Sequence, residues 1–522
     1  MTAENGHTAA LSPAGRTAEN RLRLKKQKPF SRGHGLLMPV FSLDSEYGIG
    51  TLGKPARRLL EFIARAGGAM WQVLPLGPTG YGDSPYQCFS AFAGNPYLID
   101  PKNLYERGLL TGEELAAFRQ PNTGRVDYSF LYQTRKKLLF PAFRRFEQCA
   151  SSEDKTGFEA FCSLSADWLP DYAAFSAIKE QQGMRGREDF SEFRLKSDRA
   201  VRYAGQALSE SMRFTAFLEY IFFDQWQALK AYATEKGILM VGDVPLYVSS
   251  DSADVWANPD LFELDEAGRP TSVAGVPPDP FSADGQLWGN PLYRWNAHRE
   301  SGYDWWSRRV GWQAKLFDVI RIDHFIGLCR YYRIAAGETT ARNGKWMIGP
   351  GRGLIAALTQ AAGAARFIAE DLGAVTREVR RLMEVAGFPG MRLLQFAFDG
   401  TDSPNLPHRI PQNAVVYPGT HDNQTLAGFF ADCPGSVRRN ALRYLDIHRS
   451  RDLPRAVIRE CFKCPADTAI IPMADYLGLD DAARINTPAT LGGNWSWRMT
   501  DLPTDELAEK IAALAAIYKR ER

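Results

Sequence analysis

The sequence predicts an α/β protein built on a (β/α)8 TIM barrel, with helical insertions between barrel strands. Short apolar runs alternate with segments of helical periodicity, an order typical of strand–helix units around a parallel sheet. Three acids stand at or just beyond the ends of such runs, roughly 50 residues apart, which leaves room for one or two strand–helix units at each step. At 522 residues the chain is long enough for a barrel with insertions.

Eight strands would close the barrel. Each expected strand is a short run of apolar, mostly β-branched or aromatic residues bounded by turn-forming residues. The eighth has the weakest pattern of the set. The expected strands are 36–41, 70–75, 238–244, 319–323, 367–370, 392–398, 414–417 and 483–486.

Helical periodicity fills much of the space between these runs. Apolar residues recur there at intervals of three and four, which predicts amphipathic helices that cover the outside of the barrel. The expected helices are 56–66, 214–235, 376–385, 435–446 and 505–519.

The domain organisation follows from the spacing of the strands. We expect residues 29–522 to form one catalytic domain without a C-terminal β-sandwich, after a disordered polar tail over 1–28. About 160 residues separate the second and third strands, too many for one crossover, so 80–237 is an inserted, mostly helical subdomain with helices at 128–146 and 158–179. A loop-rich insertion over 249–304 is expected to cover the cleft.

Composition excludes several classes of function. A net charge of +3 argues against nucleic acid or an anionic membrane as the main partner, and no apolar run approaches the roughly 18 residues that span a bilayer. The N-terminus has no apolar signal segment, and seven cysteines fit reduced thiols, so we expect a cytoplasmic protein. The lone Cys461–Cys464 pair lacks a second pair at metal spacing, so we expect neither metal nor cofactor. We also expect a monomer or a weak homo-oligomer.

The three acids are Asp323, Glu370 and Asp422. In a barrel the residues just beyond the strand ends converge on one bowl, and two carboxylates across one bond are what glycosidic chemistry requires. Each acid taken alone has about even odds of being an ion-paired structural residue. Asp243 adds a fourth acid at a strand exit, and Arg321, two residues before Asp323 on the same strand face, would keep a neighbouring carboxylate ionised.

Histidine and aromatic residues crowd the same loops. His324 and His421 each adjoin one of the acids and could donate hydrogen bonds to sugar hydroxyls, although a single histidine is more often structural. Flat aromatic faces suit pyranose rings, but core packing is the alternative for each residue, and is favoured for Trp295. The aromatic residues are Tyr81, Tyr86, Trp256, Phe281, Trp288, Tyr293 and Trp295.

Ordered motifs from about residue 35 to Arg498 resemble those of the amylomaltases, the 4-α-glucanotransferases of glycoside hydrolase family 77. The motifs cover nearly the whole chain and occur in the family's order. They include Trp71-Gln72-Val73-Leu74-Pro75-Leu76, Ser84-Pro85-Tyr86-Gln87, Gly242-Asp243-Val244-Pro245, Gly285-Gln286-Leu287-Trp288-Gly289-Asn290-Pro291, Arg321-Ile322-Asp323-His324-Phe325, Ala369-Glu370-Asp371-Leu372-Gly373, Thr420-His421-Asp422-Asn423 and Gly493-Asn494-Trp495-Ser496-Trp497-Arg498.

The resemblance implies a role for each acid. Asp323 would be the nucleophile, Glu370 the general acid/base, and Asp422 the residue that stabilises the transition state. It also implies α-1,4-glucans and maltooligosaccharides as donor and acceptor, and a lid over 275–285. The expected substrate-binding residues are Tyr81, Ser84, Tyr86, Asp243, Asp279, Phe281, Gln286, Trp288, Arg321, His324, Asp371 and His421.

The expected reaction is a retaining double displacement that passes a glucan chain through a covalent glucosyl-enzyme. Retention predicts a separation of about 5–5.5 Å between the carboxyl groups of Asp323 and Glu370. Two positions depart from the family pattern: Pro280 stiffens the lid loop, and Ala489 stands where glycine is usual. Two alternatives stay open, an amylase-like hydrolase that uses the same acids and a non-catalytic carbohydrate-binding barrel.

Overall fold

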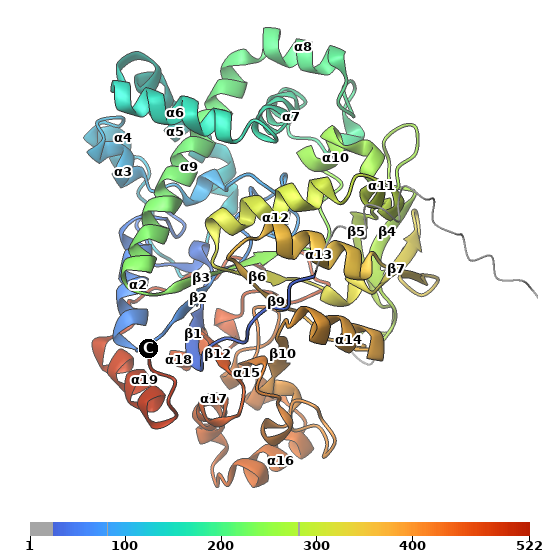
Figure 1. Ribbon diagram of the computed structural model, residues 1–522. Coiled ribbons are helices and arrows are strands. Elements are labelled where there is room, and N and C mark those ends of the chain that lie inside the picture. The colour runs from blue at the N-terminus through green and yellow to red at the C-terminus, as the bar shows by residue number, and fades with distance from the viewer. Residues whose placement is uncertain (1–23, 81, 280–281) are drawn as a thin grey trace, which may run out of the picture.

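The computed structural model describes residues 24–80, 82–279 and 282–522. Eight parallel strands close into a barrel in the order β1-β2-β3-β6-β9-β10-β11-β12, which confirms the predicted fold class (Figure 1). The barrel strands are β1 (Gly33–Leu37), β2 (Met70–Gln72), β3 (Leu239–Val244), β6 (Val319–Ile322), β9 (Arg366–Ala369), β10 (Gly390–Leu393), β11 (Ala414–Tyr417) and β12 (Thr468–Pro472).

The barrel interior is packed with apolar side chains, one or two from every strand. The buried layer consists of Leu37, Met70, Val241, Val319, Ile368, Met391, Leu393, Val415, Tyr417 and Ile470, with Phe30 beneath. Alternate residues of a strand share one face, so the inward positions two residues further along belong to Asp243, Arg321 and Glu370. The polar residues are therefore the layer directly above the apolar core, at the carboxyl ends of the strands.

Helices surround the barrel and form the insertion. Their ends follow local capping chemistry: the Thr376 side chain accepts a hydrogen bond from the backbone N–H of Val379, and left-handed Gly387 ends the same helix. The α-helices are α2 (Lys54–Arg65), α3 (Pro101–Glu106), α4 (Gly112–Ala116), α5 (Tyr128–Cys149), α6 (Ser152–Leu164), α7 (Leu169–Gln181), α8 (Asp198–Ala207), α9 (Ser209–Glu235), α10 (Ala253–Ala257), α11 (Trp295–Glu300), α12 (Asp304–Leu316), α13 (Gly351–Ala361), α14 (Arg377–Ala386), α15 (Leu426–Asp432), α16 (Gly435–Leu445), α17 (Leu453–Lys463), α18 (Met473–Tyr476) and α19 (Asp505–Ile517).

The insertion between β2 and β3 carries helices α3 to α9, coloured light blue to green above and to the left of the barrel in Figure 1. The single helix expected over 158–179 is two helices, α6 and α7. Pro170 occupies the first turn of α7, and a proline there cannot continue the preceding helical hydrogen bonds. The break lets α7 pack against the long helix α9.

A second, antiparallel sheet lies beside the barrel, on the right in Figure 1. Its strands are ordered β5-β4-β7-β8, with bounds β4 (Ser272–Val276), β5 (Gln286–Pro291), β7 (Arg330–Ala335) and β8 (Lys345–Ile348). Two of these strands, β4 and β5, lie within the insertion over 249–304 that was expected to be rich in loops. β4 and β5 contain glycine and are weak strand candidates by themselves, and the sheet forms because β4 pairs with the distant strand β7.

The prediction for the eighth barrel strand is wrong. The strand is Thr468–Pro472, which pairs with β1 on one side and β11 on the other. The expected segment 483–486 lies outside the strands and runs instead beside the loop that carries Asp422. The true strand is a short run of threonine, alanine and isoleucine, whereas 483–486 contains Arg484 and Asn486, so the apolar pattern itself favours Thr468–Pro472. The sixth strand is also shifted: it ends at Leu393, and a 3-10 helix over Leu394–Phe396 follows.

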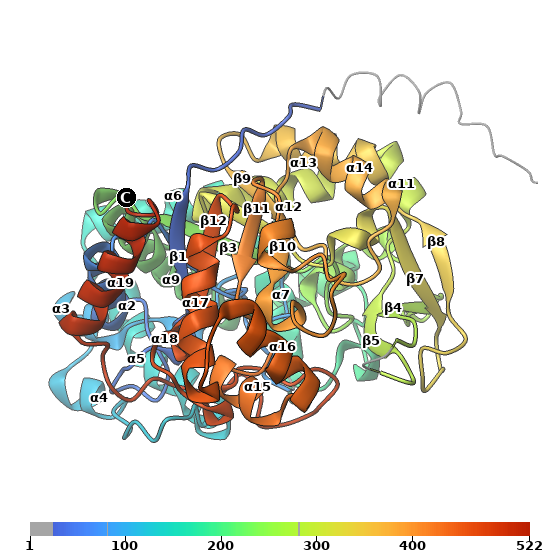
Figure 2. The ribbon, with the colours of Figure 1, turned by 90° about the horizontal axis from the view of Figure 1, so that it is seen from below.

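The first described residues and the C-terminus are both tied to the barrel. Gln27, placed in the polar tail by the sequence analysis, exchanges side-chain hydrogen bonds with the backbone of Phe367 on β9. Helix α19 packs against α2, where the red and blue ribbons meet in Figure 2. Within the described residues, no helix is both long enough and apolar enough to cross a bilayer.

Candidate active site

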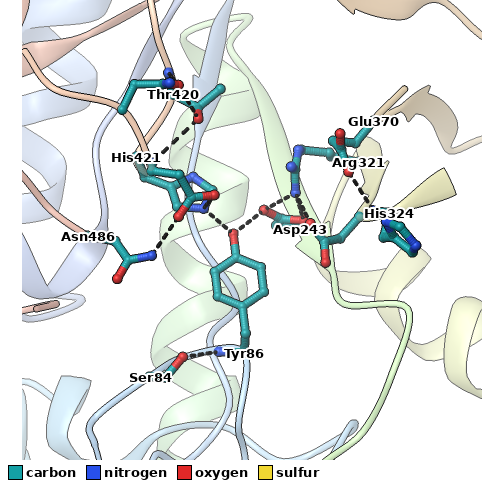
Figure 3. A network of polar contacts seen from close by, with 12 residues as sticks. Ser84, Tyr86, Asp243, Arg321, His324, Glu370, Thr420, His421 and Asn486 are labelled. Carbon is teal, nitrogen blue, oxygen red and sulfur yellow. Dashed lines mark hydrogen bonds and ion pairs between the residues drawn. The ribbon is translucent and has the colours of Figure 1, made fainter. Parts of the chain in front are cut away.

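Polar side chains from four barrel strands meet at the carboxyl-terminal end of the barrel (Figure 3). They come from the ends of β3, β6 and β9 and from the loop after β11. The side chain of Asp323 is 27% exposed and that of Asp422 is 42% exposed, whereas Asp243 is fully covered. Asp323 and Asp422 are therefore open to an incoming ligand, whereas Asp243 lies covered beneath them.

Arg321 links two of these carboxylates. Its Nη1 lies 2.7 and 2.8 Å from the two oxygens of Asp243 and 3.0 Å from Oδ1 of Asp323. Burial raises the pKa of Asp323, and the charge of Arg321 opposes that rise. A carboxylate held by a permanent cation is suited to act as a nucleophile, because it stays ionised in a dry site.

Glu370 is held by the backbone rather than by a cation. Its Oε2 accepts the N–H of His324 at 2.7 Å, and its Oε1 accepts the N–H of Leu372 at 2.7 Å. Burial raises the pKa of Glu370. Arg321 and the two backbone N–H groups favour the ionised carboxylate and lower the pKa, but they offset only part of the rise. Of the two neighbouring acids, Asp323 has the direct ion pair and loses its proton first. Glu370 is thus suited to carry a proton, as a general acid must.

His324 adopts a left-handed backbone conformation directly after Asp323, with φ of 47°. This conformation is uncommon for a residue other than glycine, and such strain clusters at functional sites. In it the N–H donates to Glu370, and the ring meets Trp288 edge-on at 4.9 Å. Burial lowers the pKa of His324 to about 4, so the imidazole is neutral.

Tyr86 bridges the two sides of the site. Its hydroxyl donates to Oδ2 of Asp243 at 2.7 Å, and it lies 2.8 Å from Nε2 of His421. Because the hydroxyl proton is given to Asp243, Nε2 of His421 donates to the tyrosine oxygen. The two rings stack at 5.3 Å, and Ser84 accepts the backbone N–H of Tyr86.

Asp422 completes the set of three acids. Its Oδ1 accepts a hydrogen bond from Nδ2 of Asn486 at 2.6 Å, and its Oδ2 lies 3.3 Å from Nε2 of His421. Burial alone would raise the pKa of Asp422, but His421 and Asn486 outweigh it and lower the value to about 2. Conversely, burial would lower the pKa of His421, and Asp422 raises it. The pair behaves as an anion beside an imidazole that readily becomes a cation.

Comparison with known proteins decides the family. Residues 38–504 match the family model described as 4-alpha-glucanotransferase. The chain belongs to the 4-alpha-glucanotransferase family. A 4-alpha-glucanotransferase from Thermus thermophilus is 46% identical over 93% of this chain and 98% of its own length, and one from Clostridium butyricum is 41% identical over 92% and 100%.

Solved structures agree with this family. An amylomaltase from Streptococcus agalactiae, in complex with acarbose, superposes with a TM-score of 0.90 at 36% identity, covering 94% of this chain and all of that one. An amylomaltase from Corynebacterium glutamicum superposes with a TM-score of 0.78 at 19% identity, covering 96% of this chain and 76% of that one, and shares the fold.

The structure brings together many of the residues expected to bind glucan in this family. Trp288 and Gln286 lie on β5, where the indole N–H of Trp288 donates to the Gln286 side chain at 3.1 Å and the Trp288 ring faces His324. Asp279 holds the backbone N–H of Ser282 in the loop before β5. Tyr81, Phe281 and Pro280 lie outside the described residues.

Asp371, which was expected to bind substrate, lies in a different setting. Its carboxylate binds Arg392 at 2.9 Å and the backbone N–H of Met391 at 2.7 Å, so it ties β9 to β10. Alternation explains this, because Glu370 faces inward and its neighbour must face outward. The geometry therefore gives Asp371 a contact between strands and does not support its expected role in sugar binding.

Three of the loop aromatics belong to the core. Trp256, Tyr293 and Trp295 are all buried, and Tyr293 packs against Trp295 and further tryptophans. The core alternative favoured for Trp295 thus holds for all three. Sequence reasoning also missed Asn486, because nothing in its local pattern marks it as a partner of Asp422, 64 residues away.

Proposed function

We propose that this enzyme of the 4-alpha-glucanotransferase family transfers α-1,4-glucan segments between maltodextrins, with Asp323, Glu370 and Asp422 as its catalytic residues. The observation that carries the proposal is the unequal support of two neighbouring acids. Asp323 is ion-paired with Arg321, while buried Glu370 is held by two backbone N–H groups. One acid is thus suited to attack and the other to carry the proton.

In the first step an oxygen of Asp323 attacks the anomeric carbon of the donor. The bond from that carbon to the 4-oxygen of the next sugar breaks, and Glu370 gives its proton to the departing oxygen. The product is an ester between the glucan and Asp323. Such attack requires the two carboxyl groups to stand about 5–5.5 Å apart in the complex with substrate.

In the second step the 4-hydroxyl of an acceptor glucan attacks the same carbon. Glu370 takes the hydroxyl proton, the ester bond to Asp323 breaks, and the anomeric configuration of the donor is retained. Asp422 stays ionised beside the sugar and stabilises the positive charge that develops on the ring in both steps. Tyr86, His421, His324, Gln286 and Trp288 supply the polar and aromatic contacts to the sugar.

Incubation with maltotriose tests the proposed activity. Transfer yields glucose together with a ladder of longer maltodextrins, which chromatography of a time course detects. Hydrolysis instead raises the number of reducing ends without lengthening any chain, and that result would assign the protein to the amylase-like alternative. Asp323→Asn serves as the control, and we expect it to yield neither set of products.

A further inference from the structure

We propose that Asn486 is a positioning residue that fixes the orientation of the Asp422 carboxylate for catalysis. The inference rests on the role proposed above for Asp422. Asn486 belongs to the segment 483–486, which was expected to be the eighth barrel strand but lies outside the barrel. This segment instead contacts the loop that follows β11, which carries His421 and Asp422.

Asn486 holds that loop at two points. Its side-chain Nδ2 donates to Oδ1 of Asp422 at 2.6 Å, the dashed line from Asn486 in Figure 3. Its backbone N–H donates to the carbonyl of His421 at 3.0 Å. The two bonds fix both the side chain and the backbone of the His421–Asp422 pair. Rotation of the Asp422 carboxylate would break the first bond while the second still held the loop.

The segment itself is held firmly. The guanidinium of Arg484 bridges two carbonyls, that of Asp422 at 2.9 Å and that of Asn486 at 2.8 Å. The carbonyl of Ile485 accepts the backbone N–H of Trp495 at 2.7 Å. Asn486 is therefore a preorganised donor, since the backbone on either side of it is bonded in place.

Other charged groups near Asp422 are already engaged. Arg321 is bound by Asp243 and Asp323, the side chain of Arg484 is bound by backbone carbonyls, and Nε2 of His421 is shared with the hydroxyl of Tyr86. Among the described residues, Asn486 alone donates a side-chain hydrogen bond to Oδ1 of Asp422.

A neutral amide suits this position. It cannot pass a proton to Asp422, so the acid remains a carboxylate, and it occupies one oxygen. The second oxygen lies on the side of His421, in a side chain that is 42% exposed and open to the sugar. Asn486 thereby sets which oxygen faces the substrate.

Two substitutions test this role. Asn486→Ala removes the donor, and we expect kcat for transfer from maltotriose to fall about 10- to 100-fold with a smaller change in KM, as loss of a hydrogen bond to a charged group would cause. Asn486→Asp keeps the shape but places two carboxyl groups at hydrogen-bond distance, where they share one proton. The ratio of its kcat to that of the unaltered enzyme should fall steadily between about pH 5 and 8 as that proton is lost.

Thr490→Ala is the matched control, because Thr490 lies in the same loop and its hydroxyl donates to the carbonyl of Thr487 and accepts from Asn494, away from Asp422. We expect it to retain the unaltered kcat and pH profile. The inference is overturned if Asp422→Asn is inactive while both Asn486 variants keep the unaltered kcat at every pH, or if the kcat ratio of Asn486→Asp does not change with pH. If Asp422→Asn keeps full activity, the proposed role of Asp422 fails instead, and the inference fails with it.

Discussion

At the scale of single residues, the site works through the different partners of its three acids. Arg321 holds Asp323 ionised, backbone N–H groups hold buried Glu370, and His421 with Asn486 holds Asp422. Glu370 is buried, whereas Asp323 and Asp422 stay partly exposed, and each of the three acids has a different partner charge or dipole. The proposed division of labour among these chemically similar groups rests on these partners.

Replacement of Glu370 by glutamine should separate proton transfer from attack. Glu370→Gln cannot protonate the leaving sugar, so we expect transfer from maltotriose to fall about 10²- to 10⁴-fold. A maltosyl fluoride donor needs no proton on its leaving group and should recover formation of the glycosyl-enzyme, measured as rapid fluoride release. If Glu370→Gln were active on maltotriose but released no fluoride from maltosyl fluoride, that result would contradict the assignment of Glu370 as the proton donor.

The pH profile should follow the same two acids. Asp323 must be ionised, and its raised pKa means that activity falls as the pH drops below that value. Glu370 must be protonated, so its raised pKa extends activity above the ordinary glutamate range and activity falls as the pH rises through it. We expect a bell-shaped dependence of kcat/KM for maltotriose. With the fluoride donor, Glu370→Gln should lose the alkaline limb of fluoride release, and persistence of that limb would assign it to another group.

At the scale of elements, the sequence pattern predicted most barrel strands and the acids at their ends, because both depend on residues that are close in sequence. The apolar runs end at Asp323 and Glu370, so both acids could be placed at strand ends from the sequence, while their proposed roles rest on the resemblance to the family. Alternation of side chains along the strand would have turned Asp371 outward. Strand β12 is a run of threonine, alanine and isoleucine that local pattern does indicate, and the prediction of the weaker segment 483–486 in its place is wrong. The antiparallel sheet and the partner of Asp422 could not be predicted, because each exists through contacts with distant segments.

The turn at Ala489 offers a test at this scale. Ala489 is exposed with φ of 61°, a left-handed conformation that costs an L-residue about 1–2 kcal/mol, and glycine adopts it without that cost. We expect Ala489→Gly to raise the free energy of unfolding in urea by about 0.5–1 kcal/mol and to leave kcat unchanged. Ala513→Gly, at an exposed position inside α19, should instead lower it by about 1 kcal/mol. Equal effects of the two changes would show that the turn is unstrained.

At the scale of the whole molecule, two arginines join the ends of the chain beneath the barrel. Arg520 is fully buried and donates to five carbonyls, those of Gly33, Phe462, Cys464, Ala466 and Asp467. Arg32 binds carbonyls of the same 462–466 segment together with that of Tyr518. These contacts join the start of β1 to the loop that leads into β12, so they close the barrel where its first and last strands meet.

Loss of this connection should destabilise the fold without changing the chemistry. Arg520→Met keeps the length of the side chain but removes five hydrogen bonds to buried carbonyls, and we expect the free energy of unfolding to fall by about 3–5 kcal/mol. Thermal and urea unfolding measure the change, while kcat of the folded fraction stays unaltered. Lys510→Ala, an exposed change on α19, is the control. An Arg520→Met protein as stable as the control would show that the arginine does not hold the barrel closed.

The covalent glycosyl-enzyme is the most direct test of the mechanism, because it forms only if the barrel holds ionised Asp323 against the sugar. Mass spectrometry of Glu370→Gln after reaction with maltosyl fluoride measures it directly, since the first step proceeds without the acid and the second lacks its base. We predict a maltosyl adduct on the peptide that contains Asp323, and none in the Asp323→Asn, Glu370→Gln double variant. An adduct on another carboxylate, or continued turnover by the double variant, would contradict the assignment of Asp323 as the nucleophile.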